Sequence, residues 1–188
     1  MSGLTDEQLM KRMQAGDHAA LDEIFRRYSL KMLYFFRRML GQEEKAQDFV
    51  QDLFVKLIDK CHLFDTKKKF STWLYTMAGN MCKNEFRAQT VRQIMQRLDP
   101  NHDFAGDELP YSLNMDCTAF QHALSQALLK LSVEHKEVFV LRYQEELSIR
   151  EISEIVNCAE GTVKSRLFYA LKKLATQLQT FSHLLKSS

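Results

Sequence analysis

The sequence has few of the residues that make turns: 6 of its 188 residues are glycine and 2 are proline. A fold with many strands needs more of them, so this scarcity argues against a β protein and favours helices. No apolar run approaches the roughly 20 residues that a membrane-spanning helix requires. The N-terminal sequence MSGLTDEQLMKRM also lacks the apolar stretch of a signal peptide. These absences predict a cytoplasmic protein.

The patterns of metal sites and of catalytic motifs are missing as well. Cys61, Cys82, Cys117 and Cys158 lie far apart with no CxxC pair, and the six histidines form no HExxH or HxxxH pair. There is no glycine-rich phosphate loop and no nucleophile with a base in motif form. We therefore expect no metal, no cofactor, no small-molecule substrate and no catalysis. Most of the cysteines are interpreted as small buried apolar residues.

The composition changes once along the chain. The stretch from Asp99 to Cys117 holds five acidic residues, no lysine or arginine, and both prolines. Its charge is −5, so the rest of the chain carries +7, because the whole has a net charge of +2. The stretch has no helical apolar period, which predicts a flexible acidic linker at residues 96–118 between domains at 1–95 and 119–188.

Apolar residues recur at steps of three and four on both sides of this linker, as in helices with one buried face. Thr5 and Gln8 predict a capping box at the first helix. Asp17 begins a second helix that ends at Gly41, and two more follow before the linker. Behind the linker the expected helices cover residues 120–131, 138–141, 148–156 and 160–181. The predicted fold is all-α, with two small helical domains that can each bury a core.

The sharpest pattern lies near the end of the chain. In LSIREISEIVNCAEGTVKSRLFYALKKL (147–174) a short helix, a three-residue break and a longer helix predict a helix-turn-helix. Asn157 stands in the break, where a positive φ is needed. One face of the second helix gathers hydroxyls, cations and an aromatic ring, which suit base edges and phosphates in a major groove, although a solvated face has a similar composition. This recognition face comprises Thr162, Ser165, Arg166, Tyr169 and Lys173, with Lys164 on its flank.

A second polar face lies on the helix FSTWLYTMAGNMCKNEFR (70–87). Its amides, cations and hydroxyl form a stripe opposite an apolar arc, and such a stripe can hydrogen-bond to bases and to phosphates. The tryptophan ahead of it fits core packing as well as stacking on an unpaired base. This amide stripe comprises Trp73, Thr76, Asn80, Lys83, Asn84 and Arg87.

The third helix has an exposed polar face with one apolar residue at its centre. Asp48, Gln51, Asp52 and Lys56 lie opposite the buried arc, and Val55 falls among them. This valine-centred face indicates contact with a protein partner, although single exposed apolar residues are common.

Three stretches, in this order, resemble segments of bacterial extracytoplasmic-function (ECF) sigma factors, two-domain members of the sigma-70 family. They are DFVQDLFVKLIDK (48–60), the helix at 70–87 and residues 131–174, within which GTVKSRL (161–167) is the most specific. The resemblance covers the whole chain. It implies a region 2-like domain, a region 4-like domain and a promoter-specificity subunit without catalytic activity. The implied partners are bacterial core RNA polymerase, promoter DNA and an anti-sigma factor, which in this family is often membrane-bound.

The resemblance also implies a role for each face. The valine-centred face would bind the clamp helices of the polymerase. The amide stripe would hold the −10 element and capture an extruded base, and the recognition face would bind the −35 duplex. The acidic linker would take the place of nucleic acid inside the polymerase. Three positions depart from the family pattern: Asn84, where Asp is common, Ala159, where Ser or Pro is usual, and Tyr169, where Arg is frequent. Tyrosine cannot make arginine's bidentate contact, so the −35 preference does not carry over.

Two other functions fit parts of the sequence. An autonomous helix-turn-helix regulator, with an N-terminal sensor or dimerisation domain, explains the second half equally well but gives the amide stripe no role. An enzyme is disfavoured by the missing motifs. A net charge of only +2 favours the sigma factor, because a protein that binds DNA unaided would need more cations to neutralise phosphates. We expect the free protein to bind promoter DNA weakly, and tightly once core polymerase is present.

Overall fold

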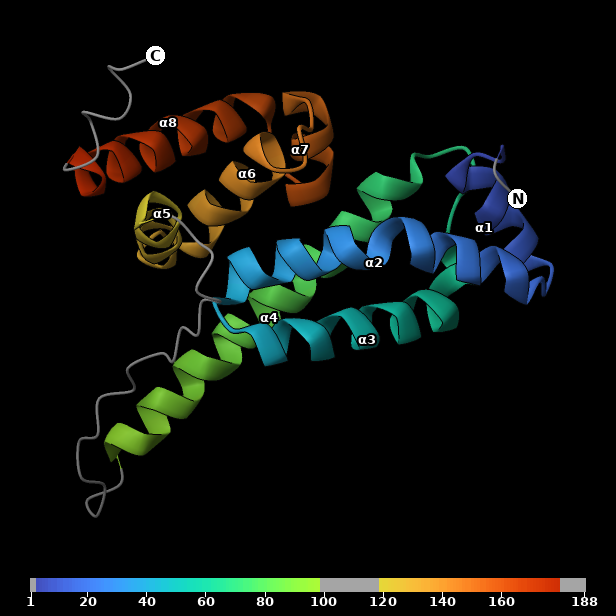
Figure 1. Cartoon of the computed structure of the whole chain (residues 1–188), viewed down its shortest axis with the longest axis horizontal. Coiled ribbons are helices and arrows are strands. Elements are labelled where there is room, and N and C mark those ends of the chain that lie inside the picture. The colour runs from blue at the N-terminus through green and yellow to red at the C-terminus, as the bar shows by residue number, and fades with distance from the viewer. Residues whose placement is uncertain (1–2, 99–118, 180–188) are drawn as a thin grey trace.

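The computed structural model describes residues 3–98 and 119–179, and all regular structure within these ranges is helical. The elements are α1 (Asp6–Gln14), α2 (His18–Leu40), α3 (Glu43–Lys60), the 3-10 helix η1 (Cys61–Leu63), α4 (Phe70–Leu98), α5 (Ala119–Leu129), α6 (Val133–Tyr143), α7 (Ile149–Val156) and α8 (Glu160–Gln177). The predicted all-α fold is confirmed, with α1–α4 in the first domain and α5–α8 in the second (Figure 1). None of these helices has the length and apolarity to cross a bilayer.

The ends of the first helices follow the predicted local signals. Thr5 Oγ1 accepts a hydrogen bond from the Gln8 amide at 3.3 Å, and Gln8 Oε1 accepts one from the Thr5 amide at 2.9 Å. The carboxylate of Asp17 caps α2 through the amide of Ala19. Gly41 ends α2 with φ 77°, a left-handed conformation that glycine adopts without a Cβ clash. These caps fix where the chain turns, because they satisfy backbone groups that a helix end leaves free.

Helices α2 and α3 lie side by side, and α4 crosses them and extends beyond their ends (Figure 1). Their interface is rich in aromatic rings, among them the fully buried Phe35, Phe36 and Phe70. The apolar period of the second and third helices predicts that Phe25 and Ile58 are buried, but they are 48% and 49% exposed. Those two predictions are wrong because the helices around them cover only part of each apolar arc. The ring of Phe25 still packs on that of Phe54, with centroids 4.7 Å apart.

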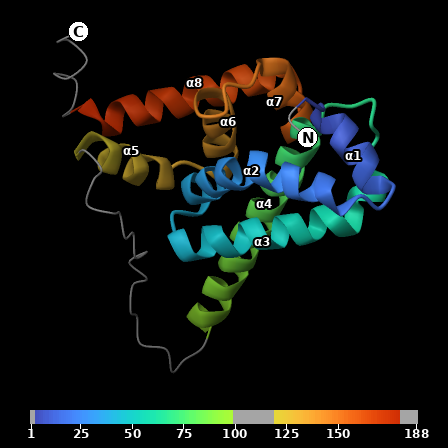
Figure 2. The ribbon, with the colours of Figure 1, turned by 45° about the vertical axis from the view of Figure 1, so that its right-hand side comes forward.

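The two domains share their main hydrophobic core, whereas the sequence suggested a core in each. The largest apolar cluster runs from α1–α4 into the second domain, through residues such as Val138, Ile152 and Leu167. A smaller cluster lies between α5 and α8 and includes Leu128 and Leu174. Small domains bury a smaller fraction of their surface than large ones, and the shared core adds to the apolar area that both remove from water. Figure 2 shows α6 and α7 lying between α8 and the first domain.

Two expected boundaries shift. Helix α4 continues to Leu98, three residues into the predicted linker, and the rest of that linker, 99–118 with both prolines and Cys117, lies outside the described residues. Helix α8 ends at Gln177 with Leu178 as its C-cap, so the prediction that it extends to Phe181 is wrong. Of the cysteines in the described residues, Cys82 is buried as expected, and Cys61 and Cys158 are partly buried.

Candidate nucleic-acid and protein interfaces

The helix-turn-helix forms as the sequence predicts. Ser148 caps α7 in a capping box with Glu151, whose amide donates to Ser148 Oγ at 3.2 Å. Asn157 adopts φ 50° and ψ 54° after α7, which confirms the expected positive φ. Ala159 provides no side-chain hydrogen bond to the N-terminus of α8, so this helix begins without a side-chain cap. The turn therefore depends on the left-handed asparagine and on the packing of α7 against α8.

Helix α8 presents its polar residues to solvent and its apolar residues to the core. Val163, Leu167, Ala170 and Leu174 are buried. Five residues of the recognition face are exposed: Thr162, Lys164, Ser165, Tyr169 and Lys173. Arg166 is partly buried, and its Nη1 lies 3.9 Å from the Cys158 sulfur. All six residues thus lie on α8, and none of them is buried.

The recognition face carries three cations, Lys164, Arg166 and Lys173. Burial lowers the pKa of His135 below its usual value; the charge of Lys173 lowers it further, Glu134 opposes the change, and Arg166 adds to it. The His135 ring lies beside that of Tyr169, with centroids 6.3 Å apart. The cations of α8 therefore create a local potential that attracts phosphate groups.

The amide stripe on α4 is divided. Asn80, Asn84 and Arg87 are exposed, and Arg87 Nη1 donates a 3.4 Å hydrogen bond to Asn84 Oδ1. The ring of Trp73 is partly buried against Phe64, with centroids 5.2 Å apart. Trp73 therefore packs on the core and keeps part of its surface in solvent.

The other two members of the stripe are engaged within the protein. Thr76 Oγ1 donates to the carbonyl of Thr72 at 2.8 Å. The ammonium of Lys83 lies 3.0 Å from Oε2 of Glu137, which belongs to α6 in the second domain. In this conformation, then, only three residues of the amide stripe are fully open to a ligand.

The valine-centred face on α3 is fully accessible. All five of its residues, Asp48, Gln51, Asp52, Val55 and Lys56, are exposed, and Val55 has 65% of its surface in solvent. In Figures 1 and 2, α3 and α8 lie at opposite edges of the molecule, with α2 and α6 between them. A partner bound on α3 would leave the recognition face of α8 free.

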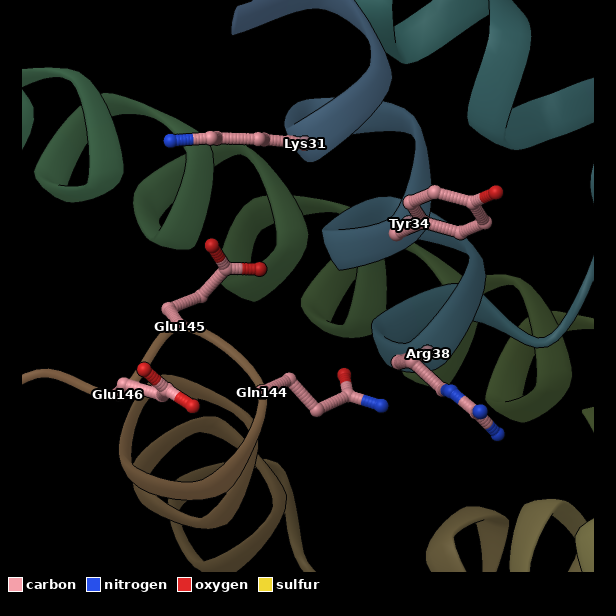
Figure 3. A pocket seen from close by; sticks show the side chains of 6 residues that line it. All are labelled: Lys31, Tyr34, Arg38, Gln144, Glu145 and Glu146. Carbon is pink, nitrogen blue, oxygen red and sulfur yellow. The ribbon is translucent and has the colours of Figure 1, made fainter.

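A cavity of about 510 Å³ lies where the two domains meet (Figure 3). It is lined by Lys31, Tyr34 and Arg38 of α2 and by Gln144, Glu145 and Glu146, which follow α6. Glu146, in the connection between α6 and α7, has a left-handed backbone conformation with φ 54°. In the described parts of the chain, no group of three or more His, Cys, Asp or Glu side chains is arranged to hold a metal.

Sequence reasoning did not single out the residues that join the domains. Lys136, Glu137 and Glu145 contact α2 and α4, and the first two are almost completely buried. Lys136 and Glu137 are consecutive residues of an amphipathic helix, and the apolar periodicity of such a helix predicts that its charged side chains are exposed to solvent. The space above Gly79 accounts for the burial of Glu137. Lys136 is buried where its ammonium donates to the carbonyl of Met39.

The comparisons with known proteins agree with this architecture. The model of Sigma-70 region 2 matches residues 24–92, and that of Sigma-70 region 4 matches residues 121–174. The ECF RNA polymerase sigma factor SigW of Bacillus subtilis is 30% identical over 177 residues, covering 90% of this chain and 95% of SigW. The ECF RNA polymerase sigma-E factor of Haemophilus influenzae is 30% identical over 189 residues, covering 94% of this chain and 96% of that factor.

A solved structure shows the same fold. The sigma factor RpoE, in a co-crystal structure with the anti-sigma factor NepR from Bartonella quintana, has a TM-score of 0.67 at 23% identity. The likeness covers 84% of this chain and 96% of RpoE. Regions 2 and 4 in one all-helical chain define a sigma factor of the sigma-70 class, a DNA-binding initiation factor without enzymatic activity. Within that class, the chain belongs to the family of ECF RNA polymerase sigma factors. The match of region 2 to the first domain speaks against an autonomous regulator with a sensor domain there.

Proposed function

We propose that this sigma factor directs core RNA polymerase to its promoters by binding the −35 duplex with α8 and opening the −10 element with α4. The observation that carries the proposal is the exposed recognition face of α8, backed by buried Val163, Leu167 and Ala170. A rigid helix with small hydroxyls and cations on one side fits a major groove. The proposed division of labour assigns residues 1–95 to core binding and −10 opening, 119–188 to −35 binding, and 96–118 to an acidic linker.

On α8, the side chains have different proposed tasks. The planar guanidinium of Arg166 contacts base edges, and Thr162 and Ser165 bind bases or nearby phosphates. Lys164 and Lys173 neutralise phosphates, a contact that adds affinity without sequence preference. Tyr169, 51% exposed, supplies an apolar ring and one hydroxyl where related proteins often carry a guanidinium. The tyrosine in place of arginine predicts that this protein prefers a −35 sequence different from the sequences that those related proteins prefer.

On α4, the amide stripe is proposed to hold a single strand. Asn80 and Asn84 offer both donors and acceptors to a base edge, and Arg87 lies beside Asn84 to pair with a phosphate. Extruding a base from the stack costs a few kcal/mol, which these contacts must return. Thr76, Lys83 and Trp73 complete the proposed −10 site.

The proposed partners are bacterial core polymerase, promoter DNA and an anti-sigma factor. The valine-centred face on α3 binds the clamp helices of the polymerase, with Val55 as its apolar contact among charged and polar neighbours. The complex of RpoE with NepR, whose sigma subunit shares this fold, supports an anti-sigma partner, which in this family is often membrane-bound. Acting on a chromosome places this chain in the cytoplasm.

Run-off transcription with bacterial core polymerase on a library of genomic fragments tests the proposal and identifies the promoter. We expect discrete transcripts that require both core enzyme and this protein. A gel-shift comparison on the recovered promoter then measures affinity with and without core enzyme. Equal affinity in both cases would support the autonomous regulator instead.

A further inference from the structure

Helix α1 lies outside the residues that match region 2, which begin at position 24, and none of the three proposed faces includes a residue of α1. It packs against α2, α4 and η1. Figure 1 shows it at the end of the first domain where the chain passes from α3 into α4. Its side chains therefore reach the connection that leads into the proposed −10 site.

One side chain of α1 holds the turn that follows α3. The side-chain nitrogen of Gln14, Nε2, donates to the backbone carbonyl of Cys61 at 2.8 Å and to that of Phe64 at 2.9 Å. A side-chain amide nitrogen has two hydrogens, and both are used here. The two carbonyls lie at the start of η1 and just after its end, and carbonyls at a helix end lack partners within the helix. Gln14 thus fixes the backbone at Phe64 from 50 positions earlier in the chain.

A second side chain of α1 holds the start of α4. Glu7 Oε1 accepts a hydrogen bond from the amide of Phe70, the first residue of α4, at 3.0 Å. This amide has no partner within the helix, and the residue before it is Lys69, whose side chain has no acceptor atom. The carboxylate also interacts favourably with the helix dipole at this end. Helix α4 is thus capped by a residue 63 positions away.

The two backbone positions that α1 holds carry rings that pack against Trp73. The centroid of the Phe64 ring lies 5.2 Å from that of Trp73 and 5.8 Å from that of Phe70. The centroids of Phe70 and Trp73 are 6.3 Å apart. Phe64 and Phe70 are 4% and 0% exposed, whereas Trp73 keeps part of its surface in solvent. A shift of either phenylalanine would therefore move the tryptophan ring.

Trp73 lies at the head of the amide stripe. Thr76 and Asn80 follow it by three and seven residues, and at about 100° per residue these steps place all three on one side of α4. An aromatic ring can stack on an unpaired base of any kind. A ring that is already held in its binding orientation loses little freedom when the base stacks, and this raises affinity. The hydrogen bonds from α1 therefore act on the −10 site through the placement of this ring.

We propose that Gln14 and Glu7 are positioning residues of the −10 site, which hold the ring of Trp73 in the orientation that stacks on the extruded base. This inference rests on the proposed function, because it requires that α4 binds the open −10 strand. It gives α1 a role in promoter opening, although α1 lies outside both the amide stripe and the match to region 2.

The first test uses the fluorescence of Trp73, the chain's only tryptophan, so that the emission of the free full-length protein reports this ring alone. Gln14→Glu replaces the donating nitrogen by an oxygen at nearly constant size, and Glu7→Ala removes the acceptor. The matched control is Gln8→Glu on the same helix, where the side chain accepts a hydrogen bond from the Thr5 amide and a carboxylate still can. Gln14→Arg keeps a donor and Glu7→Gln keeps an acceptor, so they serve as rescue variants.

We expect the emission of Trp73 to shift in Gln14→Glu and in Glu7→Ala, with severalfold faster quenching by acrylamide, because the ring loses its packing. The control and both rescue variants should match the wild type. Circular dichroism checks that helix content is retained. If these variants lose it, Gln14→Ala decides, because it removes the donor without adding a charge. Wild-type emission and quenching in the folded variants would refute the positioning role.

The second test asks whether the effect on DNA passes through Trp73. The probe is a fragment of the recovered promoter in which the −10 element is single-stranded, and the protein is the holoenzyme with core polymerase. We expect Gln14→Glu to weaken binding of this probe severalfold at unchanged affinity for core polymerase. In a Trp73→Ala background the same change should have no further effect, since the ring that it positions is gone. Equal losses in both backgrounds would assign Gln14 to general stability and overturn the inference.

The two tests separate this inference from the proposed function. Fluorescence of the free protein needs neither polymerase nor DNA, so it judges the placement of Trp73 alone. Run-off transcription judges the function. A shifted emission together with no transcripts from any protein would keep the placement by α1 and overturn the promoter role. Transcripts that depend on core enzyme, with Trp73→Ala binding the −10 probe as well as the wild type, would keep the function and refute the inference.

Discussion

The hydroxyl of Tyr75 in α4 donates a hydrogen bond to a carboxylate oxygen of Glu145, 70 residues further along the chain. Tyr75 is 3% exposed, and burial is the main reason that its pKa lies well above its ordinary value. Burial also raises the pKa of Glu145, while the hydrogen bond from Tyr75 opposes that change. The bond therefore compensates a carboxylate for the water that it loses between the domains.

Removing this hydroxyl should destabilise the protein. Tyr75→Phe keeps the ring in the core and leaves Glu145 without its donor, at a cost of about 1–3 kcal/mol in the free energy of unfolding. Urea denaturation followed by circular dichroism measures the change. The control is Tyr34→Phe, at a tyrosine that is 52% exposed, where we expect a change within about 0.5 kcal/mol. Equal stability of the two variants would mean that the bond contributes nothing.

The turn of the helix-turn-helix depends on the conformation of Asn157. Its φ of 50° costs an ordinary side chain about 1–2 kcal/mol. Asn157→Ala should therefore lower the melting temperature, and Asn157→Gly should stay close to the wild type, because glycine adopts this conformation freely. Thermal denaturation compares the three proteins. A glycine variant as unstable as the alanine variant would point to a lost side-chain contact instead.

Arg166 should contribute to sequence preference at the −35 element. Arg166→Ala should cost about 1–3 kcal/mol of binding free energy in the polymerase complex and relax the preference at one base pair. Binding to a panel of −35 variants measures both effects. Lys11→Ala, which removes an exposed cation on α1, is the charge-matched control. A loss of the same size for every sequence would assign Arg166 to a phosphate.

Val55 should be a contact with core polymerase. Val55→Arg places a charge at the centre of the valine-centred face and should weaken core binding about tenfold or more, because a desolvated contact is lost. Since the side chain is 65% exposed, the free energy of unfolding should stay within about 0.5 kcal/mol. Binding is measured by fluorescence anisotropy of labelled sigma factor. Val91→Arg, at a 54% exposed valine on α4, should leave core affinity unchanged.

The buried Lys136 should make stability depend on pH. Burial lowers its pKa from 10.5 to about 8. Because this folded-state pKa lies below the unfolded value, the stability from the neutral amine is complete above about 10.5 and is lost as pH falls through about 8. Charged Lys136 therefore destabilises the fold at neutral pH.

Lys136→Met isolates that effect. The variant should be more stable than the wild type by about 1–3 kcal/mol at pH 7, because it removes a buried charge. The loss of the hydrogen bond from Lys136 to the carbonyl of Met39 reduces this gain. The difference in unfolding free energy should shrink as pH rises from 8 to 10. Taking the difference cancels the contributions of titratable groups that do not interact with Lys136. A difference that stays constant with pH would contradict the burial of a charged amine.

Local signals predicted the helices and the three candidate faces. The capping box at Thr5, the left-handed Gly41 and Asn157, and the apolar period of each helix depend on residues within a few positions of one another. Interactions of that range are set by the local sequence, which is why these elements appear as expected. The expected boundaries differ from the observed helix ends at Leu98 and Gln177. The C-cap of α8 is Leu178, which is neither the glycine nor the asparagine that usually marks a helix end.

The helical fold, the helix-turn-helix and the polar residues of each face follow from the order of amino acids alone, because side-chain periodicity and caps act over one or two turns. The packing of the second domain on α4, the burial of Lys136 and Glu137, and the pairing of Lys83 arise only in three dimensions. Their cause is the space above Gly79 and the apolar surface shared by two domains, which join residues more than fifty positions apart.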